Sequence, residues 1–348
     1  MAADYQLLKR TLHMKYPHSV YFYSGAVGSG LATFSKHPIE SVQFHRFPVA
    51  GRLEEIFRGD GAAGKGVAVT RIRTEADGRQ IILLNSHFAA NYFQPDGWNP
   101  YETHKTIQAF EFVRVMRQEL LLNPGAAVIG LGDFNLEPDS PAYEGILLNK
   151  LGLFQDFKVH SIFGTSSSDR EPETFNLPSN SYRKQGRPIE SIDHILVATT
   201  GNVRWVPLQS KRVFEERIPV FNISYSDHFG LASTVEFREG PPEELDESED
   251  DYDSILVLQL IEDSVVQHIG RIQAEQSVRQ WRSMLLTILA ILLMAGGCWL
   301  AADTRYLISA LSFTLAILAF TLGFLELFRA VIFAADERAA HLQFLQEI

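Results

Sequence analysis

The pattern of apolar positions divides the chain into a long N-terminal part with short runs and a C-terminal part with two long ones. Apolar residues at helical spacing predict a helix over residues 101–122 and another over 143–151. Seven short apolar runs between turn signals are interpreted as strands: 20–23, 30–35, 67–73, 80–86, 126–132, 192–198 and 231–237. Strands and helices mixed in this way predict one α/β domain over residues 1–237.

The two long runs, residues 283–302 and 306–325, contain no charged residue. Each is long enough to cross about 30 Å of hydrocarbon as a helix. Only three residues separate them, which predicts an antiparallel transmembrane hairpin with both outer ends on one side of the membrane. The outer ends of the two runs carry more arginines than the turn between them. This distribution favours cytosolic termini and a cytosolic α/β domain. A buried helical hairpin in a soluble domain is the less favoured alternative.

Three further segments complete the predicted domain organisation. Residues 238–254 contain Pro241-Pro242 near their start and continue as a run of acids, which is typical of a solvated linker. Residues 255–282 carry an apolar stripe at helical spacing and predict an amphipathic juxtamembrane helix. Residues 326–348 are expected to form a C-terminal cytosolic helix. The first fifteen residues contain no apolar signal-sequence core, so the hairpin is expected to target the protein to the membrane.

Charge and cysteine content narrow the class of protein. The formal net charge is −11, and nine of the acids lie between residues 239 and 253, so the remainder is nearly neutral. A basic surface for nucleic acid is therefore not expected. The single cysteine, Cys298, lies in an apolar run and excludes an intrachain disulfide.

Polar motifs stand where predicted strands begin or end, which is where α/β sheets usually carry their sites. Asp133 and Asn135 point to the same side of extended chain, with Phe134 turned into the core. Each motif alone has a structural explanation, such as a turn or a hydrogen-bonded histidine. Their ordered combination predicts a hydrolytic site, in which a histidine takes a proton from water and carboxylates fix its tautomer. The motifs are Asn85-Ser86-His87, Gly132-Asp133-Phe134-Asn135, Ser191-Ile192-Asp193-His194 and Ser226-Asp227-His228.

A glycine-rich segment, residues 59–66, fits the pattern of a nucleotide-binding loop but does not predict one. Gly66 occupies the position of the Ser or Thr that would hold the metal ion, and the segment leads into a predicted strand rather than a helix. What remains is a loop that presents Lys65, a cation suited to a substrate phosphate, with Asp60 as its expected partner.

Taken together, the chain resembles the membrane-bound neutral sphingomyelinases and the fungal inositol phosphosphingolipid phospholipases C of the exonuclease-endonuclease-phosphatase superfamily. The resemblance covers about residues 5–237 and the hairpin. It rests on the motifs above, the loop from Asp60 to Lys65, Gly28-Ser29-Gly30-Leu31 and Ser35-Lys36-His37-Pro38-Ile39. It implies a four-layer α/β sandwich and Mg²⁺-dependent cleavage of sphingomyelin or inositol phosphosphingolipids into ceramide and a phosphorylated headgroup.

The resemblance also implies roles for the residues that match the motifs. His228 would be the general base that activates water, and Asp193 would orient it. Asp133 and Asn135 would face the scissile phosphate and the attacking water, and His87 would stabilise the developing charge. Such roles suit phosphoryl transfer, which needs mainly positioning and positive charge around phosphorus.

Further expectations concern binding and the N-terminus. Asp227 is expected at the metal, and Lys65 is expected to contact the substrate phosphate under the control of Asp60. Members of the family have an upstream strand with an Asn motif and another that ends in a metal-binding Glu, and both precede the segment that residues 4–8 resemble. The domain is therefore expected to be N-terminally incomplete, with an open sheet edge.

Several alternatives and partners follow from these observations. A nuclease or phosphoinositide phosphatase of the same superfamily is one alternative, and a catalytically dead membrane scaffold that lacks the Glu segment is another. The arginines around the hairpin predict an anionic phospholipid activator. Spans of about twenty residues fit a thin membrane such as the endoplasmic reticulum.

Overall fold

The computed structural model describes residues 2–52, 59–92, 99, 101–163, 171–199, 203–239, 253–302 and 305–348. The chain divides into two compact units, Met1–Gly51 with Glu55–Glu262 and Arg52–Glu54 with Asp263–Ile348. Most of the predicted acidic linker and two of the three residues between the predicted membrane spans lie outside the described residues.

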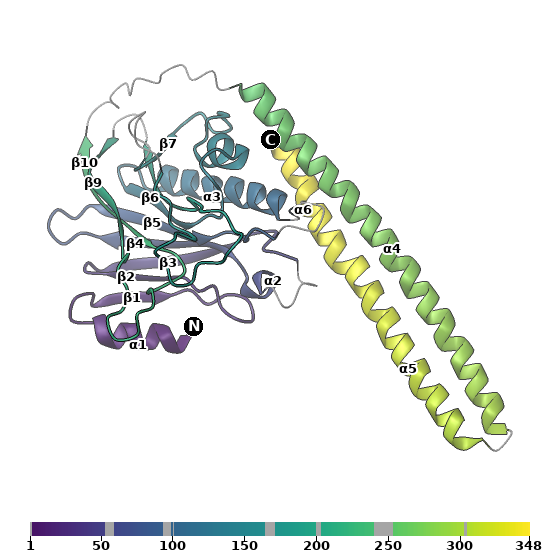
Figure 1. Ribbon diagram of the computed structural model, residues 1–348. Helices are drawn as coiled ribbons and strands as arrows, with labels where there is room; N and C mark the ends of the chain where they lie inside the picture. The colour runs from purple at the N-terminus through teal and green to yellow at the C-terminus, as the bar shows by residue number, and fades with distance from the viewer. Residues whose placement is uncertain are drawn as a thin grey trace. The chain divides into compact units, whose positions relative to one another are not determined.

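The first unit is built on a six-stranded mixed sheet, ordered β3-β4-β5-β6-β8-β7 (Figure 1). Only the central pair, β5 and β6, is parallel, and each other neighbouring pair is antiparallel. The strands are β3 (Ile39–Arg46), β4 (Gly66–Arg73), β5 (Gln80–His87), β6 (Ala127–Asp133), β7 (Lys158–Ser161) and β8 (Asp193–Thr199). The parallel pair requires a crossover connection, which α3 (Glu102–Leu122) supplies.

Helix α3 covers one face of this sheet, and the fit depends on a glycine. A Cβ at Gly130 of β6 would approach the side chains of Phe112 and Met116 to 2.8 Å. Phe112 packs edge-on against Phe134 at 5.0 Å and against Phe88 at 6.1 Å. This buried aromatic cluster lies under the ends of β5 and β6, so it fixes the level at which both strands end.

A second β layer packs on the opposite face of the sheet. It contains the antiparallel pair β1 (His18–Tyr21) and β2 (Ala32–Ser35), and Thr33 of β2 hydrogen-bonds Thr70 of β4 at 3.1 Å. Tyr5 of α1 (Ala2–Leu12) packs on the outside of this pair, 5.5 Å from the ring of Tyr21. The order α1, β1–β2, six-stranded sheet and α3 (Figure 1) gives two β layers between two α layers, and the predicted α/β class is confirmed.

Another antiparallel pair, β9 (Val203–Val213) and β10 (Gly230–Glu239), forms a separate two-stranded sheet with a bulge at Thr234 and Val235. Within the described residues, β1 and β10 each pair with one strand only. Two short helices complete the unit, α2 (Asp60–Ala63) and the π-helix η2 (Ala142–Leu147).

All seven predicted strands are present, with bounds that differ by a few residues at most. The predicted helix over 101–122 corresponds to α3, whereas helical geometry in the predicted 143–151 segment ends at Leu147. Helix α1 and strands β3, β7 and β9 were not predicted from the sequence, and the expected loop from Asp60 begins instead with the short helix α2. Strand β3 is mostly polar because it is an edge strand, and Pro207 interrupts the pattern of β9.

The amphipathic and transmembrane segments predicted over 255–282 and 283–302 form one continuous helix, α4 (Ser254–Ala302), which belongs to the second unit from Asp263 onward. It is followed by α5 (Tyr306–Phe328), the π-helix η3 (Arg329–Phe333) and α6 (Ala334–Glu347). Ser309 and Ser312 of α5 donate hydrogen bonds to the carbonyls of Gly297 and Leu293 of α4, at 2.8 and 2.6 Å. These bonds hold the two helices side by side as a hairpin.

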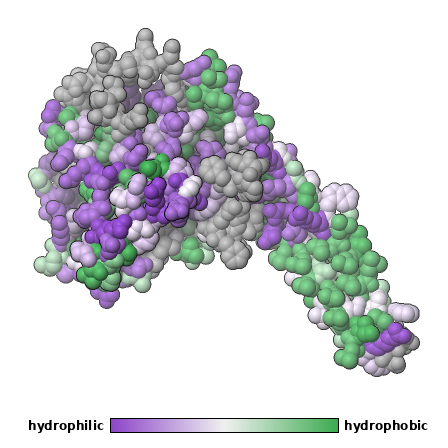
Figure 2. Space-filling view, in the orientation of Figure 1, coloured by the Kyte–Doolittle hydropathy of each residue, from purple (hydrophilic) through white to green (hydrophobic). Residues whose placement is uncertain are grey.

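The hairpin exposes many large apolar side chains, and the green region of Figure 2 shows those on the face in view. Only 11% of the most apolar window of α4 and 22% of that in Tyr306–Glu347 are buried. By length and composition, two helices among the described residues are therefore candidate membrane spans.

Candidate active site

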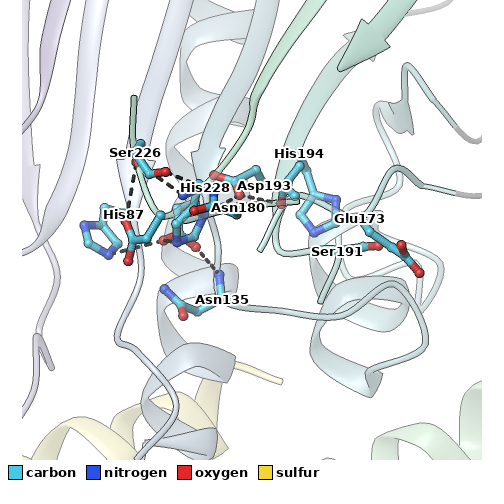
Figure 3. Close-up of polar contacts among 12 residues, drawn as sticks. His87, Asn135, Glu173, Asn180, Ser191, Asp193, His194, Ser226 and His228 are labelled. Atoms are coloured by element: carbon cyan, nitrogen blue, oxygen red, sulfur yellow. Dashed lines mark hydrogen bonds and ion pairs between the residues drawn. The ribbon is translucent and has the colours of Figure 1, made fainter. Parts of the chain in front are cut away.

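The strand register brings three of the predicted site residues into one row across the sheet. His87 ends β5 and is the register partner of Asp133, which ends β6. Asp133 is in turn the partner of Asp193, which begins β8. Partners in register project from the same face of a sheet, so the three side chains converge at one edge. Figure 3 shows two of them, His87 and Asp193, at this edge. The Nε2 atom of His87 lies 3.5 Å from Oδ2 of Asp133.

His228 joins this row from the segment before β10. Its Nδ1 atom hydrogen-bonds Oδ2 of Asp193 at 2.7 Å, and its Nε2 atom lies 3.9 Å from Oδ2 of Asp133. Thr174 also donates to Oδ2 of Asp193, at 2.6 Å, and the ring of Phe175 packs against His228 at 4.9 Å. Asp193 therefore fixes the orientation of the imidazole and leaves Nε2 directed toward Asp133.

Asn135 reaches the same site because the chain reverses direction after Asp133. Its φ of 50° lies in the left-handed region, which asparagine tolerates, and its N–H donates to Oδ1 of Asp133 at 3.0 Å. Phe134 is fully buried, as predicted. The buried ammonium of Lys105 donates to the carbonyl of Asn135 at 2.9 Å and holds the turn in place.

Lys65 lies beneath this turn and is itself buried. Its Nζ atom donates to the carbonyl of Phe88 at 2.7 Å and lies 3.1 Å from Oδ1 of Asp60. The amide of Asn135 donates to the same carbonyl at 3.3 Å. Asp60 is held in turn by the N–H of Ala90 at 3.1 Å. The expected partnership of Lys65 with Asp60 is present, and one carbonyl links Lys65 to the site.

The electrostatics of the site are dominated by burial and by its carboxylates. Burial and the charge of Asp193 raise the pKa of Asp133 to about 7. Burial alone would lower the pKa of His228, but the hydrogen bond and charge of Asp193, with the charge of Asp133, raise it to about 9. Burial and the neighbouring cations Lys65 and His228 hold the pKa of His87 below its ordinary value, which keeps this imidazole neutral.

The donor set fits a divalent cation. One ligand atom each from Asp133, Asp193 and His228 lies within 4.8 Å of the others. Burial and Asp193 make the ionised form of Asp133 costly, as its raised pKa shows, and a cation would relieve that cost. Carboxylate oxygens are the ligands that Mg²⁺ prefers. Asp227 is exposed beside Ser226, 3.4 Å away, and lies outside this group, so its role at a metal stays a prediction.

The next residue along β8, His194, projects to the opposite face and lies in a second, closed cluster. Its Nε2 atom hydrogen-bonds the carbonyl of Leu136 at 2.8 Å, and its Nδ1 atom lies 3.6 Å from Oε2 of Glu171. Glu171 accepts hydrogen bonds from Tyr143, at 2.8 Å, and from Ser161. These side chains form a buried support directly behind the site.

Four residues at or behind the site were not predicted from the sequence: Thr174, Phe175, Lys105 and Glu171. Thr174 and Phe175 lie in an irregular segment without a motif. Lys105 lies within α3, where a lysine ordinarily faces solvent, and burial is the only sign of its role. No signal in the sequence distinguishes Glu171 from a surface acid.

Comparison with known proteins agrees with this geometry. Residues 2–228 match the Endonuclease/Exonuclease/phosphatase family. The chain is 31% identical over 260 residues to a Drosophila melanogaster protein named "Putative neutral sphingomyelinase", which covers 75% of the chain and 55% of the relative. It is 32% identical over 251 residues to the Saccharomyces cerevisiae "Inositol phosphosphingolipids phospholipase C". The aligned residues cover 67% of the chain and 50% of the relative.

A mammalian relative gives a similar result. "Sphingomyelin phosphodiesterase 2" of Mus musculus is 28% identical over 250 residues, which cover 69% of the chain and 56% of the relative. The chain thus spans about half the length of the curated relatives it matches. Proteins of this family typically use a divalent metal ion. The chain belongs to the endonuclease/exonuclease/phosphatase family and is distantly related to its neutral sphingomyelinases and inositol phosphosphingolipid phospholipases C.

Proposed function

We propose that this protein is a membrane-anchored, Mg²⁺-dependent phospholipase C that hydrolyses sphingophospholipids to ceramide and a phosphorylated headgroup. The observation that carries the proposal is the pairing of His228 with Asp193 at 2.7 Å, beside the carboxylate of Asp133. The relatives named as sphingomyelinases and inositol phosphosphingolipid phospholipases C support the substrate class.

In the proposed reaction, His228 takes a proton from water at Nε2, and the water oxygen forms the new bond to phosphorus. The bond between phosphorus and the ceramide oxygen breaks, and that oxygen takes up a proton. Asp193 accepts the Nδ1 hydrogen bond throughout, so the imidazole keeps its tautomer and its positive form is stabilised. Asn135 and His87 face the phosphate, and Lys65 supplies positive charge from beneath the turn.

Asp133 and Asp193 would hold the Mg²⁺ ion, with water completing its coordination. When bound, the ion would neutralise phosphate charge and offset the carboxylate charges that keep His228 protonated.

Membrane anchoring is the second part of the proposal. The candidate spans in α4 and α5 support a two-pass hairpin. A groove beside them is lined by Arg282, by Arg329 with its ion-pair partner Glu326 at 3.4 Å, and by leucines such as Leu285 and Leu322. Two guanidinium groups beside apolar side chains suit the headgroup and upper chain of an anionic phospholipid, the proposed activator. A cytosolic catalytic unit on a thin endomembrane such as the endoplasmic reticulum follows from the flanking arginines and span lengths.

The test is Mg²⁺-dependent ceramide release by the full chain in detergent micelles that contain sphingomyelin or an inositol phosphosphingolipid. We expect release from one of the two lipids, its loss in EDTA and its loss in His228→Ala. Absence of release from both lipids by folded protein contradicts the proposal. Parallel incubation with single-stranded DNA and a phosphoinositide distinguishes the nuclease and phosphatase alternatives, and inactivity on all substrates favours a scaffold.

A further inference from the structure

Two loops that adjoin the candidate site expose apolar and basic side chains. The first, residues 180–189, is termed the basic loop, and the second, residues 214–225, is termed the apolar loop. In the apolar loop, Val220 is 84% exposed, Phe221 69% and Phe214 58%. Tyr182 and Ile189 of the basic loop are also exposed. A group of exposed large apolar side chains beside one site usually marks a surface that binds another molecule or a membrane.

The apolar loop ends in a tight turn that projects its apolar residues outward. The N–H of Ile218 donates to the carbonyl of Ile223 at 2.8 Å, and these two residues form an isolated β-bridge. Val220 and Phe221 lie at the tip, between the two bridge residues. Asn222 adopts a left-handed φ of 52°, which closes the turn. The exposed tip is therefore held in a defined conformation.

Hydrogen bonds join the two loops to each other. The N–H of Ser181 donates to Oγ of Ser224 at 3.0 Å, and the N–H of Ser224 donates to Oγ of Ser181 at 2.8 Å. The amide of Asn180 donates to the carbonyl of Ser226 at 3.0 Å, and Figure 3 shows Asn180 alongside Ser226 and His228. The surface of these loops is thus attached directly to the segment that carries His228.

The basic loop adds positive charge to this surface. Residues 182–189 contain three bases, Arg183, Lys184 and Arg187, and no acid, and all three are exposed. The side-chain amide of Asn176 holds this loop through contacts with the carbonyls of Lys184, Arg187 and Pro188 at 2.7 to 3.2 Å. The apolar loop contributes Arg217 and the exposed acids Glu215 and Glu216, so the two loops together hold four bases and two acids. This excess of cations beside an apolar tip matches the interface of an anionic bilayer, with hydrocarbon next to negative headgroups.

We infer that the basic and apolar loops dock the catalytic unit onto an anionic lipid bilayer, with Val220 and Phe221 inserted among the headgroups. The inference rests on the proposed function, because it delivers a lipid phosphodiester to His228 without removing the lipid from the membrane. A bilayer is favoured over a protein partner because the same chain carries two candidate membrane spans. The cations of the basic loop also complement anionic headgroups.

The first test locates the apolar tip. Full-length protein with Cys298→Ala receives one new cysteine, either Val220→Cys or Met14→Cys, labelled with an environment-sensitive fluorophore. Met14 is 85% exposed and so is a matched control for Val220, which is 84% exposed. In phosphatidylserine-containing proteoliposomes, we expect doxyl lipids to quench the probe at 220 and not the probe at 14. Equal quenching at both positions, or quenching at neither, overturns the inference. A shielded but unquenched probe at 220 assigns the loop to a protein partner and also overturns it.

The second test separates docking from chemistry. We expect Val220→Ser with Phe221→Ser to lower hydrolysis of lipid in proteoliposomes by about tenfold and to leave hydrolysis of bis(p-nitrophenyl) phosphate unchanged. Arg183→Gln with Lys184→Gln and Arg187→Gln is expected to remove the advantage of phosphatidylserine-containing vesicles over neutral ones. An equal loss on both substrates contradicts docking. If the wild type cleaves neither lipid, the proposed function fails, while the quenching result still decides the inference.

Discussion

Asp193 and His194 are adjacent in β8, yet they belong to two different histidine–carboxylate clusters. Asp193 faces the open site, where it pairs with His228 and its side chain is 21% exposed. His194 faces the interior, where it lies near Glu171 and its side chain has no exposed surface. The alternation of a strand places chemically similar pairs on opposite sides of one sheet. A histidine and an acid are therefore not enough to define a reactive site.

The clusters differ in what surrounds their carboxylates and in their access to solvent. In the closed cluster, Glu171 accepts hydroxyl hydrogen bonds from Tyr143 and Ser161, while its Oε2 atom and Nδ1 of His194, 3.6 Å apart, are buried without a hydrogen-bond partner among the described residues. In the open cluster, Oδ2 of Asp133 lies 3.5 Å from His87 and 3.9 Å from His228, and the side chains are about one-fifth exposed or more. The open cluster is thus accessible to water, a cation or a phosphate, whereas the closed cluster is sealed in the interior and supports the fold.

Replacing the imidazole of the open cluster should give the largest effect. We expect His228→Ala to lower ceramide release by about a thousandfold, within the range for loss of a general base. Its side chain is 22% exposed, so the melting temperature should change little. Measurements of ceramide release and of thermal unfolding, both in detergent, check these two expectations. A fall in melting temperature as large as that of Glu171→Ala would remove the distinction between the clusters.

Truncating the acid of the closed cluster should have the opposite signature. Glu171→Ala leaves the hydroxyls of Tyr143 and Ser161 without their acceptor and removes the carboxylate that lies 3.6 Å from the imidazole of His194, which should cost about 3 kcal/mol of unfolding free energy. The protein that remains folded should retain most of its turnover per molecule. Urea unfolding measures the free energy of unfolding, and titration of the active fraction gives the turnover per folded molecule. The exposed acid Glu173 provides the control, and Glu173→Ala should change neither.

Acid should weaken the closed cluster in a defined direction. Burial alone would raise the pKa of Glu171, but the nearby His194, with Ser161 and Tyr143, outweighs burial and lowers it. The ionised carboxylate therefore contributes stability that is present above the ordinary pKa of 4.5 and is lost as pH falls through the folded-state value. Glu171→Gln should flatten the unfolding free energy below pH 4.5 relative to wild type, and an unchanged acid slope would contradict this assignment.

The smallest expected effect comes from one hydroxyl. Tyr143→Phe removes a single buried hydrogen bond to Glu171 and should cost about 1 kcal/mol of stability. Tyr182→Phe changes an exposed tyrosine and serves as the control, with an expected cost near zero. If the two variants unfold at the same urea concentration, the closed cluster contributes less than its geometry indicates.

Much of this site could be predicted from the chain, because each motif follows or precedes an apolar run and so marks a strand end. His87, Asp133, Asp193 and His228 were found in this way. The sequence could not show that Asp133 and Asp193 are register partners, because β6 and β8 are far apart in the chain. It also gave no sign that the two residues of Asp193-His194 would serve different clusters.

The strand and the site residues that were not predicted from the sequence also have physical explanations. Strand β3 has few apolar residues because an edge strand has less to bury. Lys105 and Glu171 are charged residues in the interior, and only their partners, which are distant in sequence, make them tolerable there. The spacing of apolar and polar residues along an element indicates which of its faces is buried. It does not indicate which residue, distant in sequence, pairs with a buried charge.

The unbroken course of α4 has a mechanical consequence. At 1.5 Å per residue, its 49 residues extend roughly 74 Å, and in the proposed two-pass anchoring about 30 Å of hydrocarbon would account for less than half of that length. The remainder would then be a stiff helical extension of the span. A tilt of about 10° at the bilayer would displace its far end by roughly 7 Å, so lipid thickness or tension could be transmitted along the helix as movement.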